Sequence, residues 1–235
     1  MGIIKKIKEF VLDCLFPPLC LSCHKNIKNQ SNYLCDNCFS EINFYDGMFC
    51  PKCGQRAIDE KLSCYCLEEY ILAPACHFEI PIIPLLYGLK YLKLQKVHIF
   101  LSALIIFYFQ KINFYPKDYL ITYIPIHKIK QRKRGFNQSK LIAQTIGEKF
   151  SLEIISMLIK NKNNQPQAKI KDPQKRIQNA KDSFSLKKDI HIENKKIIII
   201  DDVSTTGATL KQATHLLKTL GAKKIIAVVV ANAKK

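Results

Sequence analysis

A run of four isoleucines, Ile197 to Ile200, passes directly into Asp201 and Asp202 and then into a threonine-rich segment that ends at Leu210. Four consecutive β-branched residues predict a strand that is buried on both faces, as strands are in the middle of a parallel sheet. The two acids are then expected at the carboxyl end of that strand, which is the edge where open α/β sheets bind ligands. No other segment constrains the chain as much, because this one predicts a fold class and a site together.

The residues after the acids have the composition of a phosphate-binding loop. Apolar residues from Leu210 to Leu220 recur at helical spacing, and Gly221 is expected to end the helix as its C′ residue. The N-terminus of such a helix offers free N–H groups and the positive end of the helix dipole to an anion. The loop before it consists of Thr205, Thr206, Gly207, Ala208 and Thr209. The alternative is a buried strand, a polar turn and a capped helix that bind no ligand.

This segment resembles the loop that binds 5-phosphoribosyl 1-pyrophosphate (PRPP) in the type I phosphoribosyltransferases. The resemblance implies that Asp201 and Asp202 contact the ribose hydroxyls, that residues 205–209 surround the 5-phosphate, and that Mg²⁺ accompanies PRPP. In an active enzyme the two acids would be catalytic, because they would stabilise the positive charge that develops at the anomeric carbon. Two other phosphate-binding patterns, G-x-x-x-x-G-K-[ST] and G-x-G-x-x-G, are absent from the sequence.

The first third of the chain contains all ten cysteines, and eight of them form tight pairs. Two consecutive pairs provide the four thiolates of a tetrahedral zinc site, so the sequence predicts two zinc ribbons. The zinc, about two ions per chain, is expected to be structural because no coordination position is left for water. The ligands would be Cys20, Cys23, Cys35 and Cys38 in the first site, and Cys50, Cys53, Cys64 and Cys66 in the second. Similar intervals within the two sites indicate an internal duplication, and the unpaired Cys14 and Cys76 are expected to be small buried residues.

The composition changes near Cys76, where the paired cysteines stop, and this change predicts three parts. They are an N-terminal amphipathic helix over residues 1–19, a double zinc-ribbon domain over 20–76, and an α/β domain with a parallel-sheet core over 77–235. Within the last part, the pattern predicts two helices between residues 82 and 109, a strand over 119–126, a helix capped by Asn137, and a strand over 223–231. Residues 161–194 are polar and are expected to form loops with little core.

A basic segment follows the expected strand 119–126. In type I phosphoribosyltransferases a comparable strand precedes the loop that holds the pyrophosphate of PRPP, and the resemblance implies this role for Pro125, His127, Lys128 and Arg134. It also implies that Lys90 lies near the entry to the same site, with an exposed helix residue as the alternative. The alternative for the basic segment is a solvated charge run or a nucleic-acid patch, which would consist of Lys130, Arg132, Lys133 and Arg134.

The formal net charge is +18, from 37 Lys and Arg against 19 Asp and Glu. Such a charge favours polyanionic partners, which include nucleic acid, PRPP-like phosphates and an anionic membrane surface, but it does not choose among them. The apolar stretch 97–109 is too short to cross a bilayer, and the segment from Met1 to Phe16 carries charges inside what would be the apolar part of an export signal. A cytoplasmic location without a membrane span is therefore expected.

The whole pattern resembles the ComF family, in which a zinc-ribbon region precedes a type I phosphoribosyltransferase-like domain. The resemblance rests on the cysteine pairs, Leu89-Lys90-Tyr91, Arg134-Gly135-Phe136-Asn137-Gln138, Asp201 to Thr209, and the spacing of Gln167, Arg176, Asn179 and Phe184. It implies natural competence and DNA uptake, with single-stranded DNA and other uptake proteins as partners, in the cytoplasm or at the inner face of the cytoplasmic membrane. A loop with Gln167, Arg176 and Asn179 could close over a charged ligand as a lid; a disordered linker is the alternative.

The sequence departs from the family in two places. Residues 160–165 contain no arginine, which is frequent there, and the C-terminal region reads Ala231-Asn232-Ala233 where an Ala-Arg sequence is common.

Two functions of different class follow. The first is a competence protein that binds PRPP without turnover and also binds single-stranded DNA. In that case Tyr33, Phe39 and Phe49 could stack on bases, with small-domain core as their alternative. The second is an active phosphoribosyltransferase that releases pyrophosphate from PRPP as it modifies a nucleobase or another acceptor. The sequence contains no compelling general base and no recognisable nucleobase pocket, so it leaves this choice open.

Overall fold

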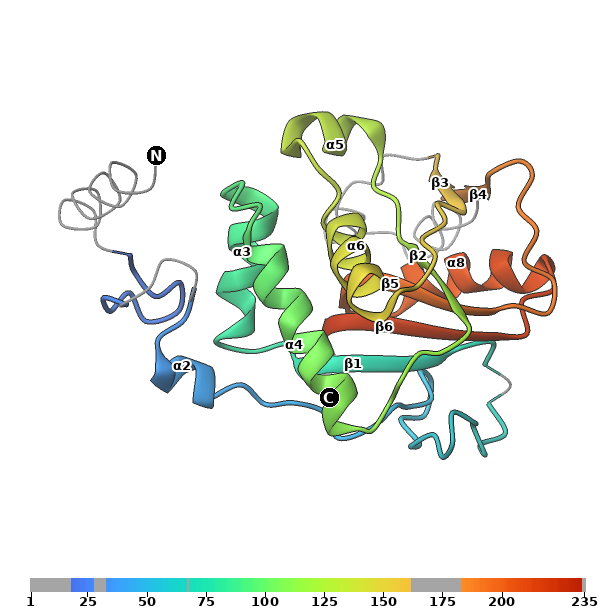
Figure 1. The fold of residues 1–235 in the computed structure, drawn as a ribbon, viewed down its shortest axis with the longest axis horizontal. Helices are drawn as coiled ribbons and strands as arrows, with labels where there is room; N and C mark the ends of the chain where they lie inside the picture. Colours follow the sequence, from blue (N-terminus) through green and yellow to red (C-terminus); the bar gives the residue numbers. More distant parts are fainter. Residues whose placement is uncertain (1–17, 28–32, 67, 162–182, 234–235) are drawn as a thin grey trace, which may run out of the picture.

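A sheet of four parallel strands forms the centre of the computed structural model, which describes residues 18–27, 33–66, 68–161 and 183–233 (Figure 1). The strand order is β1-β6-β5-β2, and all three pairs of neighbours are parallel. The bounds are Ile71–His77 for β1, Tyr119–Tyr123 for β2, Lys196–Ser204 for β5 and Lys224–Asn232 for β6. The predicted α/β class with a parallel core is confirmed.

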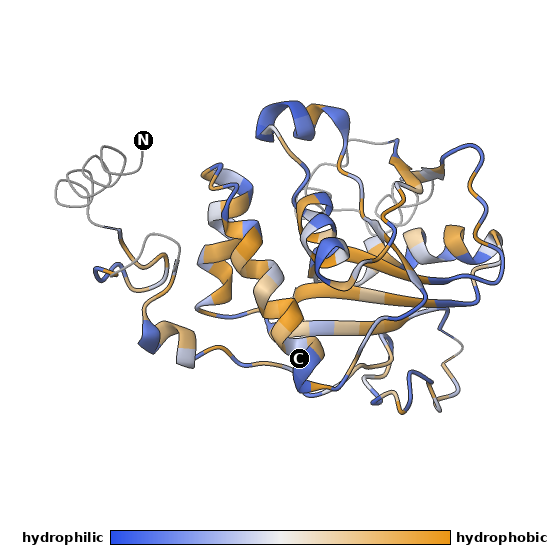
Figure 2. Ribbon diagram, in the orientation of Figure 1, coloured by the Kyte–Doolittle hydropathy of each residue, from blue (hydrophilic) through white to orange (hydrophobic). Residues whose placement is uncertain are grey.

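The isoleucine run lies in β5, one of the two central strands. Ile197 to Ile200 are fully buried, and they alternate between two apolar clusters on opposite faces of the sheet. Figure 2 shows the same apolar character in β6 and in helices α3 and α4, whereas α5 is strongly hydrophilic. Because layers of structure cover both faces, the strand needs no polar alternation.

Three helices cover one face of the sheet, and one helix with a small ladder covers the other. α3 (Ile82–Tyr91), α4 (Val97–Lys111) and α6 (Gln138–Phe150) belong to the first layer. α8 (Ala208–Thr219) and the antiparallel pair β3 (Leu158–Lys160) and β4 (Phe184–Leu186) belong to the second. Two short helices, α2 (Asp36–Ser40) and α5 (Lys128–Arg134), complete the described elements.

The predicted helix boundaries agree with the structure where capping residues mark them. The side chain of Asn137 accepts a hydrogen bond from the backbone N–H of Ser139 at 3.0 Å, at the start of α6. Gly221 directly follows Leu220, the C-cap residue of α8, and has a φ of 78°, as a C′ glycine does. β5, α8 and β6 therefore form the expected strand, helix and parallel strand.

The boundary expected near Cys76 divides a strand of the sheet. β1 begins at Ile71, and its residues pair in parallel register with β6 from Ile71–Ile226 to His77–Asn232. We propose instead that the α/β domain begins just before β1. Cys76 itself is fully buried in this strand, in agreement with its interpretation as a small buried residue.

Both cysteine-rich segments pack against the α/β domain. Cys20, Leu34 and Cys38 share one apolar cluster with residues of α3 and α4. In the second segment, Phe49 and Leu72 of β1 exchange backbone hydrogen bonds of 2.8 and 2.9 Å, so this segment extends the edge of the sheet. The unpaired Cys14 lies outside the described residues, and so does nearly all of the helix expected over residues 1–19.

Candidate functional site

Asp201 and Asp202 lie near the carboxyl end of β5 and are 8% and 4% exposed. The strand does not end at the acids but continues to Ser204, so both carboxylates are fixed by the sheet. Lys90, from the last turn of α3, places its Nζ 2.8 Å from Oδ2 of Asp202. Burial of the Lys90 ammonium opposes its charge, but the attraction of Asp202 raises the pKa of Lys90 above its usual value.

Asp201 is held by the start of α6. Ser139 Oγ donates a hydrogen bond of 3.0 Å to Asp201 Oδ1, and the backbone N–H of Asp202 donates one of 2.9 Å to the same oxygen. Burial, followed by the repulsion of Asp202, nevertheless raises the pKa of Asp201 to about 7. A cation or a hydroxyl donor in this space would favour the charged form of Asp201, so the acid is suited to respond to a ligand.

The threonine-rich loop joins the acids to α8. Gly207, with a φ of 75°, is the N-cap residue of α8, and the backbone N–H of Ala208 donates to Thr206 Oγ1 at 3.4 Å. Thr205, Thr206 and Thr209 are exposed. Hydroxyls and backbone N–H groups at the start of a twelve-residue helix can bind a phosphate.

The Arg134-Gly135-Phe136-Asn137-Gln138 segment links α5 to this site. Gly135, with a φ of 90°, ends α5, and the Arg134 guanidinium donates a hydrogen bond to the side chain of Gln138. Asn137 Nδ2 donates to the carbonyl of Ile124 at 3.0 Å, which ties the end of β2 to the start of α6. Ser139 directly follows Gln138, the last residue of this segment, so the segment positions the side chain that holds Asp201.

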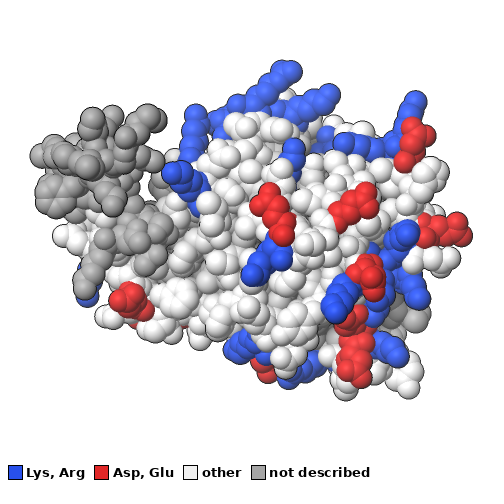
Figure 3. All heavy atoms as spheres, in the orientation of Figure 1, with Lys and Arg blue, Asp and Glu red and all other residues white. Residues whose placement is uncertain are grey.

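The basic segment forms a helix, not the expected loop. α5 contains no acidic residue, and His127 caps it by accepting a hydrogen bond of 3.3 Å from the backbone N–H of Ile129. The exposed cations are Lys128, Lys130, Arg132 and Lys133, while Pro125, His127 and Arg134 are half-buried. Figure 3 shows Lys and Arg side chains gathered on the rim of the molecule where α5 lies. A row of exposed cations on one short helix can bind a polyanion.

Two residues at this site were not predicted from the sequence. Ser139 contacts Asp201 as described above, and Lys160 comes from β3. Burial lowers the pKa of Lys160 to about 8, with Asp201 opposing and Lys130 adding to the effect. Ser139 is the second residue after the predicted helix cap Asn137, and this position is a usable signal. Lys160 stands at the end of an apolar run, just before the polar stretch 161–194, and nothing in the sequence around it indicates a site.

The predicted lid residues Gln167, Arg176 and Asn179 lie outside the described residues. Phe184, the last residue of that pattern, begins β4 and is buried in the apolar cluster on the α8 side of the sheet.

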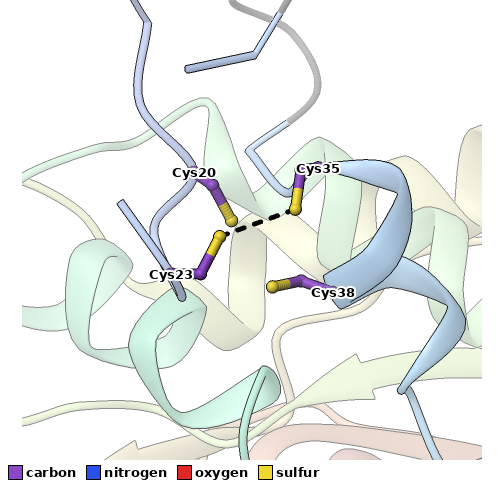
Figure 4. A group of neighbouring side chains, drawn as sticks. All are labelled: Cys20, Cys23, Cys35 and Cys38. Carbon is purple, nitrogen blue, oxygen red and sulfur yellow. Dashed lines mark hydrogen bonds between the residues drawn. The ribbon is translucent and has the colours of Figure 1, made fainter. Parts of the chain in front are cut away.

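The eight paired cysteines form the two predicted groups of four. Within each group the sulfur atoms lie within 4.8 Å of one another, and Figure 4 shows the four side chains of the first group pointing toward a common centre. The Sγ atoms of Cys23 and Cys35 are 3.6 Å apart. Four thiolates at about 2.3 Å from one tetrahedral zinc lie roughly 3.8 Å from each other. Both groups therefore fit structural zinc.

The two cysteine segments repeat the same backbone turn. Cys20 N–H donates to the carbonyl of Lys25, and Cys50 N–H donates to that of Gln55, at 2.9 and 2.8 Å. The residues after the second cysteines, His24 and Gly54, both have positive φ, of 60° and 74°. The sequence-based inference of a duplication is thus matched by the local geometry.

Comparisons with known proteins agree with this architecture. The family model of the phosphoribosyl transferase domain matches residues 133–235, and that of the double zinc ribbon domain matches residues 11–68. Among the described residues, no helix has the length and apolarity that a membrane span requires.

Three relatives share the sequence over different lengths. The DNA utilization protein YhgH of Escherichia coli K12 is 25% identical over 217 residues, which cover 89% of this chain and 94% of that protein. Competence protein F of Haemophilus influenzae is 23% identical over 215 residues, 88% of this chain and 93% of the relative. Competence protein ComFC of Bacillus subtilis is 34% identical over 104 residues, 44% of this chain and 40% of that protein. With a double zinc ribbon ahead of a phosphoribosyltransferase domain, and with relatives of this kind, the chain belongs to the ComF family.

Proposed function

We propose that this protein acts in DNA uptake by binding PRPP with Mg²⁺ at the end of β5 and single-stranded DNA along α5. The observation that carries the first half is the combination of a buried acid pair with an exposed hydroxyl loop at the start of α8. The names of the relatives, which refer to competence and DNA utilization, support the second half.

Each group in the site has a distinct task in this proposal. Residues 205–209 would bind the 5-phosphate through backbone N–H groups and hydroxyls. Asp201 and Asp202 would accept hydrogen bonds from the ribose hydroxyls, and Mg²⁺ would be held by oxygen ligands of PRPP and the protein. Lys90, already 2.8 Å from Asp202, would offset the charge of the acids and contact the pyrophosphate side, together with His127 and Lys128.

Calorimetric titration with PRPP and Mg²⁺ tests the first half. The wild type is expected to bind, and replacing Asp201→Asn together with Asp202→Asn is expected to abolish detectable binding. Asp118→Asn is the matched control, because Asp118 is exposed and far along the chain from the loop. If the wild type binds no PRPP, the assignment of the loop is wrong.

Single-stranded DNA tests the second half. Affinity is expected to fall as salt rises, with a slope of about 0.7 per phosphate neutralised. Replacing Arg132, Lys133 and Arg134 by Ala should weaken binding and reduce that slope. No binding at low salt would remove this half of the proposal.

An active phosphoribosyltransferase is the alternative for the same site. The acids would then stabilise the oxocarbenium-like state as pyrophosphate leaves the anomeric carbon and the acceptor forms the new bond. Release of pyrophosphate from PRPP with nucleobases or single-stranded DNA as acceptors, lost in the Asp201→Asn and Asp202→Asn variant, would favour this alternative.

A further inference from the structure

Two tyrosines of α3 lie together at the surface. The rings of Tyr87 and Tyr91, here called the tyrosine pair, are 54% and 64% exposed, and their centroids are 4.9 Å apart. They are four residues apart and therefore share one face of the helix. In the part of the chain that the structure describes, no other pair of contacting aromatic rings has both members exposed. The fold itself leaves much of both rings accessible to a ligand.

The other aromatic candidates for base stacking are used in packing. Tyr33 and Phe39 each contact the ring of Phe100 edge-on, with centroids 6.3 and 6.2 Å apart. Phe49 contacts Tyr45 at 5.5 Å and lies against β1. These residues belong to the interface between the zinc ribbons and the α/β domain, so the tyrosine pair is the better candidate.

The helix that carries the tyrosine pair also reaches the acid pair. Lys90 directly precedes Tyr91, and its Nζ reaches Asp202 at 2.8 Å. On the other side of the acids, Ser139 holds Asp201, and Gln138 bonds to Arg134 of α5. α3 and α5 thus flank the same edge of the sheet.

The charges around the tyrosine pair select a polyanion. Lys93 and Lys96 are exposed in the connector that follows α3. No acidic residue occurs between Ile80 and Lys117, and none occurs in α5. Lys and Arg side chains line the rim of the molecule from α5 toward the end of α3 (Figure 3). Exposed rings next to cations match a ligand that has both flat bases and phosphates.

We infer that the tyrosine pair is a stacking platform for the bases of a single strand of DNA, whose phosphates follow Lys93, Lys96 and α5. This inference rests on the DNA-binding half of the proposed function and names the surface that reads bases. Stacking on an exposed ring accepts any base, because every base has a flat π face. The platform therefore binds single strands without sequence preference, and duplex DNA, whose bases are already stacked, binds less well.

The test compares an oligothymidylate with an abasic strand of the same length, which keeps the phosphates but lacks the bases. Fluorescence anisotropy of the labelled strands gives both affinities at one salt concentration. Replacing Tyr87→Ala with Tyr91→Ala is expected to weaken binding of oligothymidylate about tenfold or more. Binding of the abasic strand should change by less than about twofold, since its contacts are electrostatic. The matched control, Tyr87→Phe with Tyr91→Phe, keeps both rings and should bind as the wild type does.

A second measurement does not depend on affinity. The chain contains no Trp, so its intrinsic emission comes from Tyr. Stacked bases should quench part of this emission when the wild type binds DNA. This quenching should be absent from the Ala variant.

The outcomes separate the inference from the proposed function. If the wild type binds neither strand at low salt, the DNA-binding proposal fails. If it binds oligothymidylate and the Ala variant binds equally well, or loses affinity equally for both strands, the tyrosine pair is not a stacking platform. Urea unfolding of each variant checks that the fold is retained.

Discussion

Lys90 and Asp202 form an ion pair that is largely shielded from solvent. The Lys90 side chain is 22% exposed, and that of Asp202 is 6% exposed. An ion pair of this kind contributes little relative to apolar residues, but removing one partner leaves the other charge buried and unpaired. The contact is therefore expected to matter for stability as well as for ligand binding.

Replacing Lys90→Met should show this cost directly. The free energy of unfolding is expected to fall by about 1–3 kcal/mol, because the Asp202 carboxylate loses its cation. Lys96→Met is the control: Lys96 is exposed, and a surface change of this kind is expected to stay within about 0.5 kcal/mol. Urea unfolding at pH 7 measures both, and equal stabilities would show that the ion pair is unimportant.

The raised pKa of Asp201 predicts a stability that depends on pH. The folded protein binds the proton of Asp201 more tightly than the unfolded chain, whose aspartates titrate near 3.9. The contribution of the Asp201 carboxyl to the free energy of unfolding is fully present below pH 4 and is lost as the pH rises through about 7. Asn is a neutral replacement of the same size that can still accept the hydrogen bond from Ser139.

The difference between Asp201→Asn and the wild type should therefore grow with pH. Between pH 5 and pH 8 the variant is expected to gain about 2–3 kcal/mol in unfolding free energy relative to the wild type. Urea unfolding at the two pH values measures the gain, and Asp118→Asn, an exposed acid, should show none. A gain that shrinks with rising pH would contradict the direction of the shift.

At the scale of elements, each zinc ribbon supports a different wall of the site. A Cβ atom on Gly88 of α3 would lie 3.4 Å from Leu21 of the first ribbon. The second ribbon runs through Glu68, whose carboxylate is 3.8 Å from Lys211 of α8, to Tyr70, whose hydroxyl would be 3.4 Å from a Cβ atom on Gly207. The first ribbon thus supports the helix of Lys90, and the second supports the phosphate loop.

Loss of one zinc site should therefore loosen one wall selectively. Cys35→Ser is expected to increase amide hydrogen exchange in α3 more than in α8, and Cys64→Ser should do the reverse, because local opening follows local contacts. Hydrogen exchange with mass spectrometry measures both helices in one experiment, and each variant is the control for the other. The same pattern of exchange in both variants would mean that the ribbons act as one unit.

The differences between sequence and structure occur in particular elements. β5, α8 and β6 were predictable because a buried isoleucine run, a capped helix and a second apolar run leave few alternatives. β1 was missed because Pro74 disfavours a strand, yet β1 is an edge strand, where proline is tolerated. α5 was taken for a loop because its apolar content is too low to reveal helical spacing.

The same division holds for the candidate site. Asp201, Asp202 and the threonine loop are adjacent in the chain, so their proximity follows from the sequence. Ser139 of α6 bonds to Asp201, and Lys160 of β3 interacts electrostatically with Asp201; only the packing of those elements brings them near the acid. Contacts between distant elements leave no local pattern, which is why the supporting residues were not predicted.

Zinc content is a property of the whole molecule, because Cys20 and Cys38 belong to the same apolar cluster as α3, α4 and α6. The wild type is expected to hold about two zinc ions per chain, and Cys53→Ser should hold about one. Cys76→Ala is the control, since Cys76 is buried in β1 outside both groups and should keep both ions. Elemental analysis with protein quantification measures the ratio. Fewer than about one zinc in the wild type, or loss of zinc from Cys76→Ala, would reject this ligand set. Removal of both ions by a chelator should lower the melting temperature of the whole chain, because metal binding is coupled to folding.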